Sequence, residues 1–395
     1  MNRTLLIIIG VVMALVLIAV WVYLLFFNQP GGGDDNFADL NFANTDREVV
    51  DDTSPTFSEE EALVEVSDDS VLKQLTTEPV IGFQEVAATA SSTPVVYYLK
   101  PGTGHMMSID LETGEEERVS GTTIPNASRG VISITGQLVL IQAGQGHQAE
   151  LLLGELSSSS EELKLTTLSE TVLDFTITTN NELLYLEGDG GYTTIKQYQP
   201  ETKTTKTILT IPFAETAITW GNEVGGVHYI YPKASGQLEG YLYQVANGKF
   251  SRLPVAGYGL TAYGTADYVI ISRQLTGRYQ SAIFNRTLDQ TKPLEMALLP
   301  EKCVLENTKS SFVCADSTTA LKTDMPDLWY EGGVSYVDNF WRIDTASSSA
   351  SLLLDTKKES GRELDIINLV TGQNSGDIYF QNKNDQALWL YQISR

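Results

Sequence analysis

The chain has 395 residues, with 26 Lys and Arg side chains against 50 Asp and Glu, and a formal net charge of −24. This acidity argues against nucleic acid as a partner, because phosphate binding needs clustered Lys and Arg. The 2 cysteines and 3 histidines exclude a disulfide-dense small fold and a multi-Cys zinc site, and we expect neither a metal nor another cofactor.

The first predicted element is a transmembrane helix at residues 4–27, which include no charged side chain. A helix of this length spans the hydrocarbon core of a bilayer, about 30 Å thick. Arg3 precedes the segment and Asp34 and Asp35 follow it, so we expect a cytoplasmic N-terminus and an extracytoplasmic remainder. The alternative is a cleaved signal peptide, whose apolar region is usually shorter and ends in small residues.

Residues 28–70 are predicted to form an acidic flexible linker, because they contain 13 acidic side chains and a single basic one, Arg47. Such a segment buries too little apolar surface to offset the entropy of ordering, and its like charges extend it. We interpret it as a spacer, with an acidic arm that binds a cation or a partner as the alternative. The chain thus divides into an anchor at 1–27, a linker at 28–70 and a domain at 71–395.

The domain consists of short apolar or alternating runs separated by Gly, Asn, Asp, Ser and Thr, a pattern typical of strands and turns. One kind of strand recurs at residues 95–99, 138–141, 183–186, 228–231, 268–271, 311–314 and 377–380. Other strands are predicted around these, at residues 107–110, 173–177, 207–211, 216–220, 242–245, 340–344, 351–354 and 388–391.

The recurring strand returns every 40 to 45 residues, apart from a last step of 66. Four strands in each such period are typical of a β-propeller blade, so the fold class is predicted to be all-β, with seven blades. The last repeat ends after three strands, and residues 71–76 are predicted to supply its missing outer strand and close the ring. A pair of β-sandwiches is the alternative, but it does not explain the regular spacing.

Across roughly residues 71–395 the repeats resemble those of WD40-like and TolB-like propellers, without the Gly-His and Trp-Asp signatures of WD40 blades. Residues 303, 312–315, 326–332 and 338–344 resemble a motif of uncharacterised single-pass membrane-anchored propeller proteins from reduced-genome bacteria. These resemblances imply a propeller fold and a membrane address, and they imply no activity.

The two cysteines are predicted to form a cross-strand disulfide. Cys303 and Cys314 flank the turn-forming residues 307–310, and a hairpin centred there places them opposite each other. Opposed residues at a non-hydrogen-bonded position bring their side chains close, and an extracytoplasmic address favours oxidation. The alternative is a pair of buried free thiols.

The most distinctive loop is an insertion at residues 315–333, predicted to join the second and third strands of a blade at one mouth of the propeller. Its Trp329 and Tyr330, beside Asp324 and Asp327, are candidates for stacking on a sugar or anchoring a protein partner. Alternatively, both aromatic side chains pack over the channel and fix the loop. The same rim is predicted to carry His105, His147, Lys233, Arg273, Arg278 and Asp385.

Sequence motifs of common enzyme classes are missing: there is no G-x-S-x-G, no H-E-x-x-H and no P-loop. We therefore expect a membrane-tethered scaffold that binds an envelope protein or a glycan. One alternative is an envelope glycan hydrolase or lyase with carboxylates at the mouth, which would need a defined carboxylate separation. Another is a structural subunit of a secretion or pilus assembly.

Overall fold

The computed structural model describes residues 70–86, 95–146, 149–157, 162–221, 226–306, 310–317, 325–373 and 375–393. All of them lie in one compact unit that extends from Leu63 to the C-terminus. Within these ranges, no helix is long and apolar enough to cross a membrane. The predicted span at 4–27, the linker up to residue 69, His147 and Asp324 fall outside the described residues.

The described residues form six antiparallel sheets, and the first three contain four strands each. The first sheet comprises β2 (Gly82–Val86), β3 (Val95–Leu99), β4 (Met106–Asp110) and β5 (Glu116–Ser120). The second comprises β6 (Ala127–Ile132), β7 (Leu138–Ala143), β8 (Glu150–Leu156) and β9 (Leu163–Ser169). The third comprises β10 (Val172–Ile177), β11 (Leu183–Asp189), β12 (Tyr192–Gln199) and β13 (Thr204–Ile211).

The fourth sheet has seven strands, β14 (Thr216–Thr219), β15 (His228–Pro232), β16 (Glu239–Ala246), β17 (Lys249–Gly264), β18 (Tyr268–Leu275), β19 (Arg278–Asn285) and β20 (Gln290–Pro293). The fifth comprises β21 (Cys303–Leu305), β22 (Ser311–Ser317), β23 (Asp338–Asp344) and β24 (Ala350–Leu354). The sixth comprises β25 (Ile366–Thr371), β26 (Ile378–Asn382), β27 (Leu388–Tyr391) and the N-terminal β1 (Leu72–Gln74). Short helices η2 (Pro300–Lys302), α2 (Asp327–Tyr330) and α3 (Thr356–Ser360) lie in connections.

The recurring strand predicted from the sequence is present in every sheet, as β3, β7, β11, β15, β18, β22 and β26. In each four-stranded sheet it is the second strand, with a hydrogen-bonded neighbour on both sides. All seven residues of β22 and all five of β26 are buried. Burial on both faces explains why these strands read as apolar runs rather than as strict alternation.

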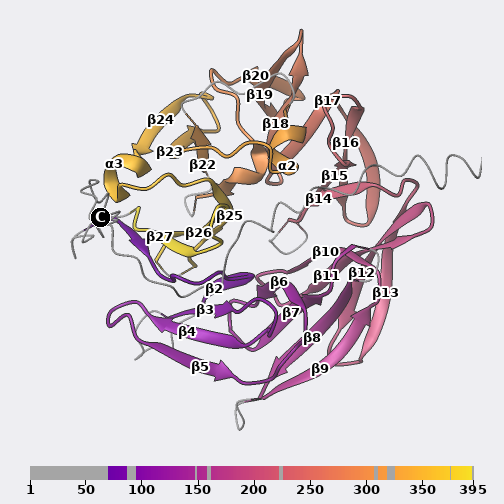
Figure 1. Ribbon diagram of the computed structural model, residues 1–395. Helices are drawn as coiled ribbons and strands as arrows, with labels where there is room; N and C mark the ends of the chain where they lie inside the picture. The colour runs from indigo at the N-terminus through magenta and orange to yellow at the C-terminus, as the bar shows by residue number, and fades with distance from the viewer. Residues whose placement is uncertain are drawn as a thin grey trace, which may run out of the picture. The chain divides into compact units, whose positions relative to one another are not determined.

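The sheets follow one another around a ring (Figure 1), and hydrophobic clusters join each sheet to the next. Successive sheets meet through pairs of clustered residues, Leu99 with Val139, Leu140 with Phe175, Leu186 with Ile230, Ile270 with Phe312, Phe340 with Phe380, and Tyr379 with Val96. Because the last sheet packs on the first, the described sheets form a closed series. The fold is therefore a β-propeller, as the repeat predicts.

The N-terminal strand closes the last sheet, as predicted from residues 71–76. In Figure 1, β1 lies beside β27, and Leu72 is directly paired with Tyr391. The side chain of Leu72 is fully buried in the cluster shared by the fifth and sixth sheets. The outer edge of β27 is thus covered by a strand from the other end of the chain.

Two details differ from the sequence expectation. Six separate sheets replace the expected seven, because the 16-residue strand β17 runs through the fourth sheet without a loop. Its register shifts between Tyr258 and Thr261, where Gly259 has a φ of 61°. The insertion begins later than residue 315, because β22 continues to Ser317 and is fully buried.

Candidate functional site

The candidate site lies at one end of the strands, which we call the rim. In an antiparallel sheet the strands alternate in direction, so the loops between second and third strands lie at the same end as the connections to the next sheet. The loop between β22 and β23 belongs to this end, as predicted for the insertion. Two pockets and the described part of the insertion occupy the rim.

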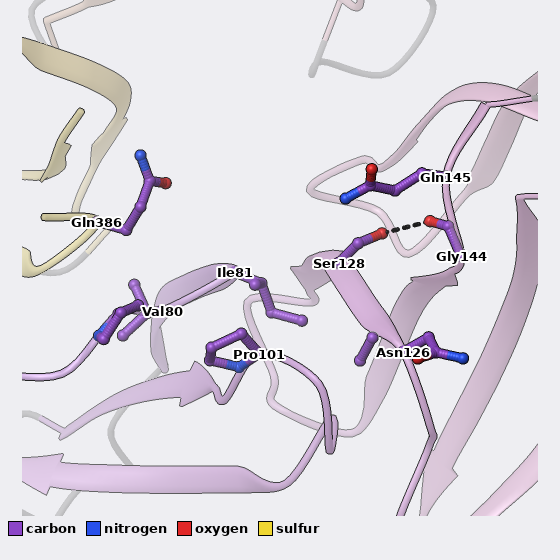
Figure 2. Close-up of a pocket in the computed structure, with 10 residues that line it drawn as sticks. Val80, Ile81, Pro101, Asn126, Ser128, Gly144, Gln145 and Gln386 are labelled. Atoms are coloured by element: carbon purple, nitrogen blue, oxygen red, sulfur yellow. Dashed lines mark hydrogen bonds between the residues drawn. The ribbon is translucent and has the colours of Figure 1, made fainter. Parts of the chain in front are cut away.

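The first pocket, here the amide pocket, has a volume of about 500 Å³. It is lined by Pro79, Val80, Ile81, Pro101, Asn126, Ala127, Ser128, Gly144, Gln145 and Gln386, from connections of the sixth, first and second sheets (Figure 2). The hydroxyl of Ser128 donates to the carbonyl oxygen of Gly144 at 2.8 Å. Asn126 and Gln145 are exposed, and their amides are the polar groups that face solvent here.

The second pocket, here the cationic pocket, has a volume of about 470 Å³ and shares Pro79 and Pro101 with the first. Its other lining residues are Glu78, Lys100, Thr103, His105, Met107 and Arg118. Lys100 Nζ lies 3.0 Å from Glu78 Oε2, and His105 Nε2 lies 3.0 Å from Thr123 Oγ1. Partial burial, followed by the charges of Arg118 and Lys100, lowers the pKa of His105.

Residues 325–337, which we call the strap, cross the rim from the fourth sheet to the sixth. The Asp327 carboxylate accepts hydrogen bonds from Gly236 N at 2.8 Å and Ser235 Oγ at 3.1 Å, both in the β15–β16 loop. At the other side, Lys383 Nζ donates to the carbonyl oxygen of Trp329 at 2.6 Å. Met325 and Trp329 are buried in a cluster that includes Tyr279. The strap is thus fastened to two different sheets.

The structure assigns different environments to the two aromatic candidates of the insertion. Trp329 is 6% exposed, and its Nε1 donates to the carboxylate of Asp365 at 3.1 Å. Its ring also packs against Lys383 Nζ, 4.2 Å from the ring centroid. These contacts agree with packing that fixes the loop. Tyr330 is 46% exposed, and its hydroxyl donates to Glu301.

A buried ionic network lies beneath the strap. Lys302 Nζ lies 2.6 Å from Asp338 Oδ2 and 2.5 Å from Asp365 Oδ1, and the three side chains are at most 2% exposed. Asp365 also accepts from the backbone N of Tyr336 at 3.2 Å, and Asp338 from the backbone N of Ile366 at 2.7 Å. Burial raises the pKa of Asp338, and the neighbouring Lys302 opposes that rise. The network joins the strap, through Tyr336, to the starts of β23 and β25 and to η2.

Asp316, in the buried strand β22, makes the stability of the domain depend on pH. Burial and the neighbouring Asp338 raise the pKa of its carboxyl to about 8, so the folded chain keeps a proton that the unfolded chain releases near pH 4. Its contribution to stability is present below pH 4 and is lost as the pH rises towards 8. Asp316→Asn should remove this loss, on the order of a few kcal/mol, from urea denaturation curves across that range. Parallel pH dependences for the chain and the variant would contradict the assignment.

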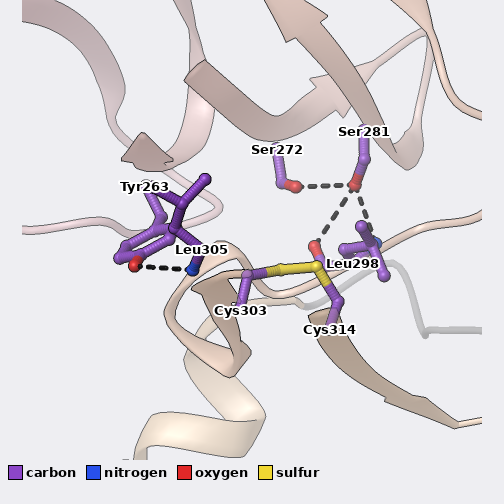
Figure 3. Close-up of a disulfide and its surroundings, with 7 residues drawn as sticks. All are labelled: Tyr263, Ser272, Ser281, Leu298, Cys303, Leu305 and Cys314. Carbon is purple, nitrogen blue, oxygen red and sulfur yellow. Dashed lines mark hydrogen bonds between the residues drawn. A yellow bond between two sulfur atoms is a disulfide. The ribbon is translucent and has the colours of Figure 1, made fainter. Parts of the chain in front are cut away.

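The predicted register of the cysteine pair is confirmed. Cys303 in β21 is directly opposite Cys314 in β22, with 4.0 Å between their Cα atoms, and the two form a disulfide (Figure 3). Both cysteines are buried in the cluster between the fourth and fifth sheets. Next to them Ser281 Oγ accepts from Leu298 N at 2.7 Å. The disulfide therefore cross-links two inner strands within the core.

The other rim candidates are spread over several sheets. Arg273 is partly buried on β18 and donates to the carbonyl oxygen of Ala256, and burial lowers its pKa. Arg278 and Lys233 are exposed, in or beside rim loops of the fourth sheet. Asp385 is in the β26–β27 loop of the sixth sheet, and its Oδ2 lies 4.0 Å from Arg362 Nη2. Among the predicted residues that the structure describes, only His105 lines one of the two pockets.

The sequence reasoning missed the residues that surround His105, and it missed Lys302, Asp338 and Asp365 beneath the strap. Lys100 directly follows β3 and Arg118 lies on β5, and the β3–β4–β5 pairing brings them to His105. The described residues hold no group of three or more His, Cys, Asp or Glu side chains placed to bind a metal ion.

Comparison with known proteins supports the fold alone. No family model and no curated protein matches the chain. An oligogalacturonate lyase from Vibrio parahaemolyticus is 11% identical, with a TM-score of 0.53 over 81% of this chain and 92% of that one. An oligogalacturonate lyase in complex with manganese is 8% identical, with the same TM-score and coverage. TolB from Acinetobacter baumannii is 11% identical, with a TM-score of 0.40 over 78% of each chain. In fold, the chain is similar to β-propeller proteins.

Proposed function

We propose that this protein is an extracytoplasmic binding module of the cell envelope, anchored by residues 4–27 and spaced from the membrane by residues 28–70. The uncharged segment and the acidic linker support this address. The propeller presents its rim to a partner, and the two pockets of the first, second and sixth sheets are the binding site.

The same proposal gives the propeller seven blades. The fourth sheet then consists of two four-stranded blades that share β17, the first half as outer strand of one blade and the second half as inner strand of the next. Two observations support this division: the register shift after Tyr258 and a cluster in which Tyr229 of β15 and Val269 of β18 belong to one core. Strands of one flat sheet would not pack face to face in this way.

The observation that carries the proposal is that the strap covers one part of the rim, whereas the other part contains two pockets. Over the fourth to sixth sheets, the strap is fastened by Asp327, Trp329 and the buried network below it. Over the sixth, first and second sheets, two pockets of about 500 and 470 Å³ remain open. Concave surfaces with a few convergent polar groups are the usual ligand sites of folded domains.

The glycan hydrolase alternative finds less support at the pockets. Glycoside hydrolysis uses two carboxylates on opposite sides of the scissile bond. Among the described lining residues of both pockets, Glu78 is the single carboxylate, and it is paired with Lys100. The lyase activity belongs to those two proteins, since identities of 11% and 8% support a shared fold and no shared chemistry.

Site-specific photocrosslinking in intact cells tests the binding module. A photoreactive residue at Gln145, in the amide pocket, should give a crosslinked adduct, because benzophenone groups react with C–H bonds of a protein or a glycan. The control position is Asn247, which is exposed in the β16–β17 turn at the end opposite the rim. Equal labelling at both positions, or none at Gln145, would contradict the proposal. Protease added outside the cells should digest the domain, and protection from it would refute the address.

A further inference from the structure

The cationic pocket concentrates positive charge in an acidic protein. Lys100, His105 and Arg118 line it together, against the single carboxylate of Glu78. The chain as a whole has 50 acidic and 26 basic side chains. Because the pKa of His105 is lowered, the positive charge of this site comes from Lys100 and Arg118. Two cations against one carboxylate depart from the acidic average of the chain, and a cleft with a net charge attracts ligands of the opposite sign.

The charges in this pocket are incompletely neutralised by the protein. Glu78 pairs with Lys100 at 3.0 Å. Arg118 is exposed on the outermost strand of its sheet, and it makes no hydrogen bond or ion pair with the described residues. Its charge acts on His105, whose imidazole is held by Thr123. A guanidinium without a partner offers a planar set of donors that matches a carboxylate or a phosphate.

The adjoining amide pocket has different polar groups. The two pockets meet at Pro79 and Pro101, so one ligand can occupy both. The exposed amides of Asn126 and Gln145 can each donate and accept hydrogen bonds. The amide of Gln386 is already used, since its Nε2 donates to the carbonyl oxygen of Lys383 at 2.8 Å. Amides that make no side-chain hydrogen bond with the described residues, beside apolar Val80 and Ile81, suit a ligand rich in hydroxyl groups.

We propose that the cationic pocket is an anion subsite and that the two pockets together bind an acidic saccharide, whose carboxylate or phosphate is held by Arg118 and whose hydroxyls face Asn126 and Gln145. This inference rests on the proposed function and names the class of ligand for the same site. Carboxylate-bearing and phosphate-bearing saccharides share the required chemistry, and the experiment separates them.

Binding is measured with the full chain in detergent and four probes at low salt. The probes are an oligoglucuronate, a phosphate-bearing gluco-oligosaccharide, a neutral gluco-oligosaccharide of the same length and an acidic peptide. At least one of the first two should bind, and the tighter one identifies the anion. Its affinity should fall as salt is added, because the interaction is partly electrostatic. Equal binding of the neutral saccharide, preferential binding of the acidic peptide, or no binding by any probe would overturn the proposal.

Substitutions locate the subsite. Arg118→Gln should weaken binding of the anionic saccharide at least about tenfold, the effect of losing one charge-assisted hydrogen-bonded contact. Arg252→Gln is the matched control, because Arg252 is an exposed arginine on β17 that stacks on Tyr241, away from both pockets. Equal effects of the two substitutions, or none from Arg118→Gln, would overturn the subsite. If no probe binds while Gln145 still gives its crosslinked adduct in cells, the anion subsite is wrong and the binding module stands.

Discussion

Replacing Lys302 with methionine is expected to destabilise the domain by about 3–5 kcal/mol, the usual effect of removing one partner from a buried ion pair. Lys302 is the only ammonium that bridges Asp338 and Asp365 among the described side chains, and all three are almost completely buried. Without it, Asp338 loses its cation and Asp365 retains the more distant Lys383, at 4.0 Å, in a medium where an unpaired charge is strongly disfavoured. Thermal and urea denaturation of the full chain measure the loss.

The control for this substitution is Lys357→Met. Lys357 pairs with Glu363 at 2.6 Å, but these side chains are 56% and 60% exposed. An exposed pair contributes little, so the control should change stability by less than about 0.5 kcal/mol. Combining Lys302→Met with Asp338→Asn and Asp365→Asn should recover part of the lost stability, because the uncompensated charges are then gone. Equal effects of Lys302→Met and Lys357→Met would show that the buried network is not important for stability.

Removing β1 is expected to open the ring. A chain that starts at Ser70 should fold like the full chain, whereas one that starts at Thr77 should lose stability and aggregate. The second chain lacks Leu72, whose buried side chain is part of the core between the last two sheets. It also exposes the backbone of β27, which otherwise bonds to the N-terminal strand, and an unpaired edge of this kind recruits other chains.

Size-exclusion chromatography and thermal denaturation distinguish the two truncated chains. Leu72→Ala in the full chain should cost about 2–5 kcal/mol through the cavity that it leaves. A peptide covering residues 70–78 should restore part of the stability of the shorter chain, since added strands can complete an exposed sheet. A monomeric, fully stable chain starting at Thr77 would contradict the closure by β1.

The fold could be predicted from local patterns because propeller strands repeat. Val96 and Val139 lie on strands whose apolar character is visible in any short window. The closing strand was predicted because the last repeat lacked one, and the disulfide because Cys303 and Cys314 are symmetric about a turn. The seven-stranded sheet was not expected. Nothing in residues 249–264 indicates that a continuous strand, rather than a turn, connects the two repeats.

The site was less predictable, because its residues meet only in the folded chain. Lys302, Asp338 and Asp365 are charged residues, which a sequence reading places on the surface. Trp329 was predicted with two alternative roles, and its bond to Asp365 could not be inferred from residues so far apart. Arg118 stands among Glu115, Glu116 and Glu117, so its charge is hidden in an acidic stretch until the strand pairing places it beside His105.

The long strand β17 also determines where the ring is able to deform. Neighbouring sheets joined by a loop can tilt against each other, because the loop absorbs the change in backbone angles. β17 passes through the fourth sheet without such a loop and is hydrogen-bonded to β16 and β18. The seam between β1 and β27 is held by three residue pairs and has no covalent connection nearby. Elastic distortion of the ring should therefore concentrate at that seam, and amide hydrogen exchange should be faster in β1 than in β17.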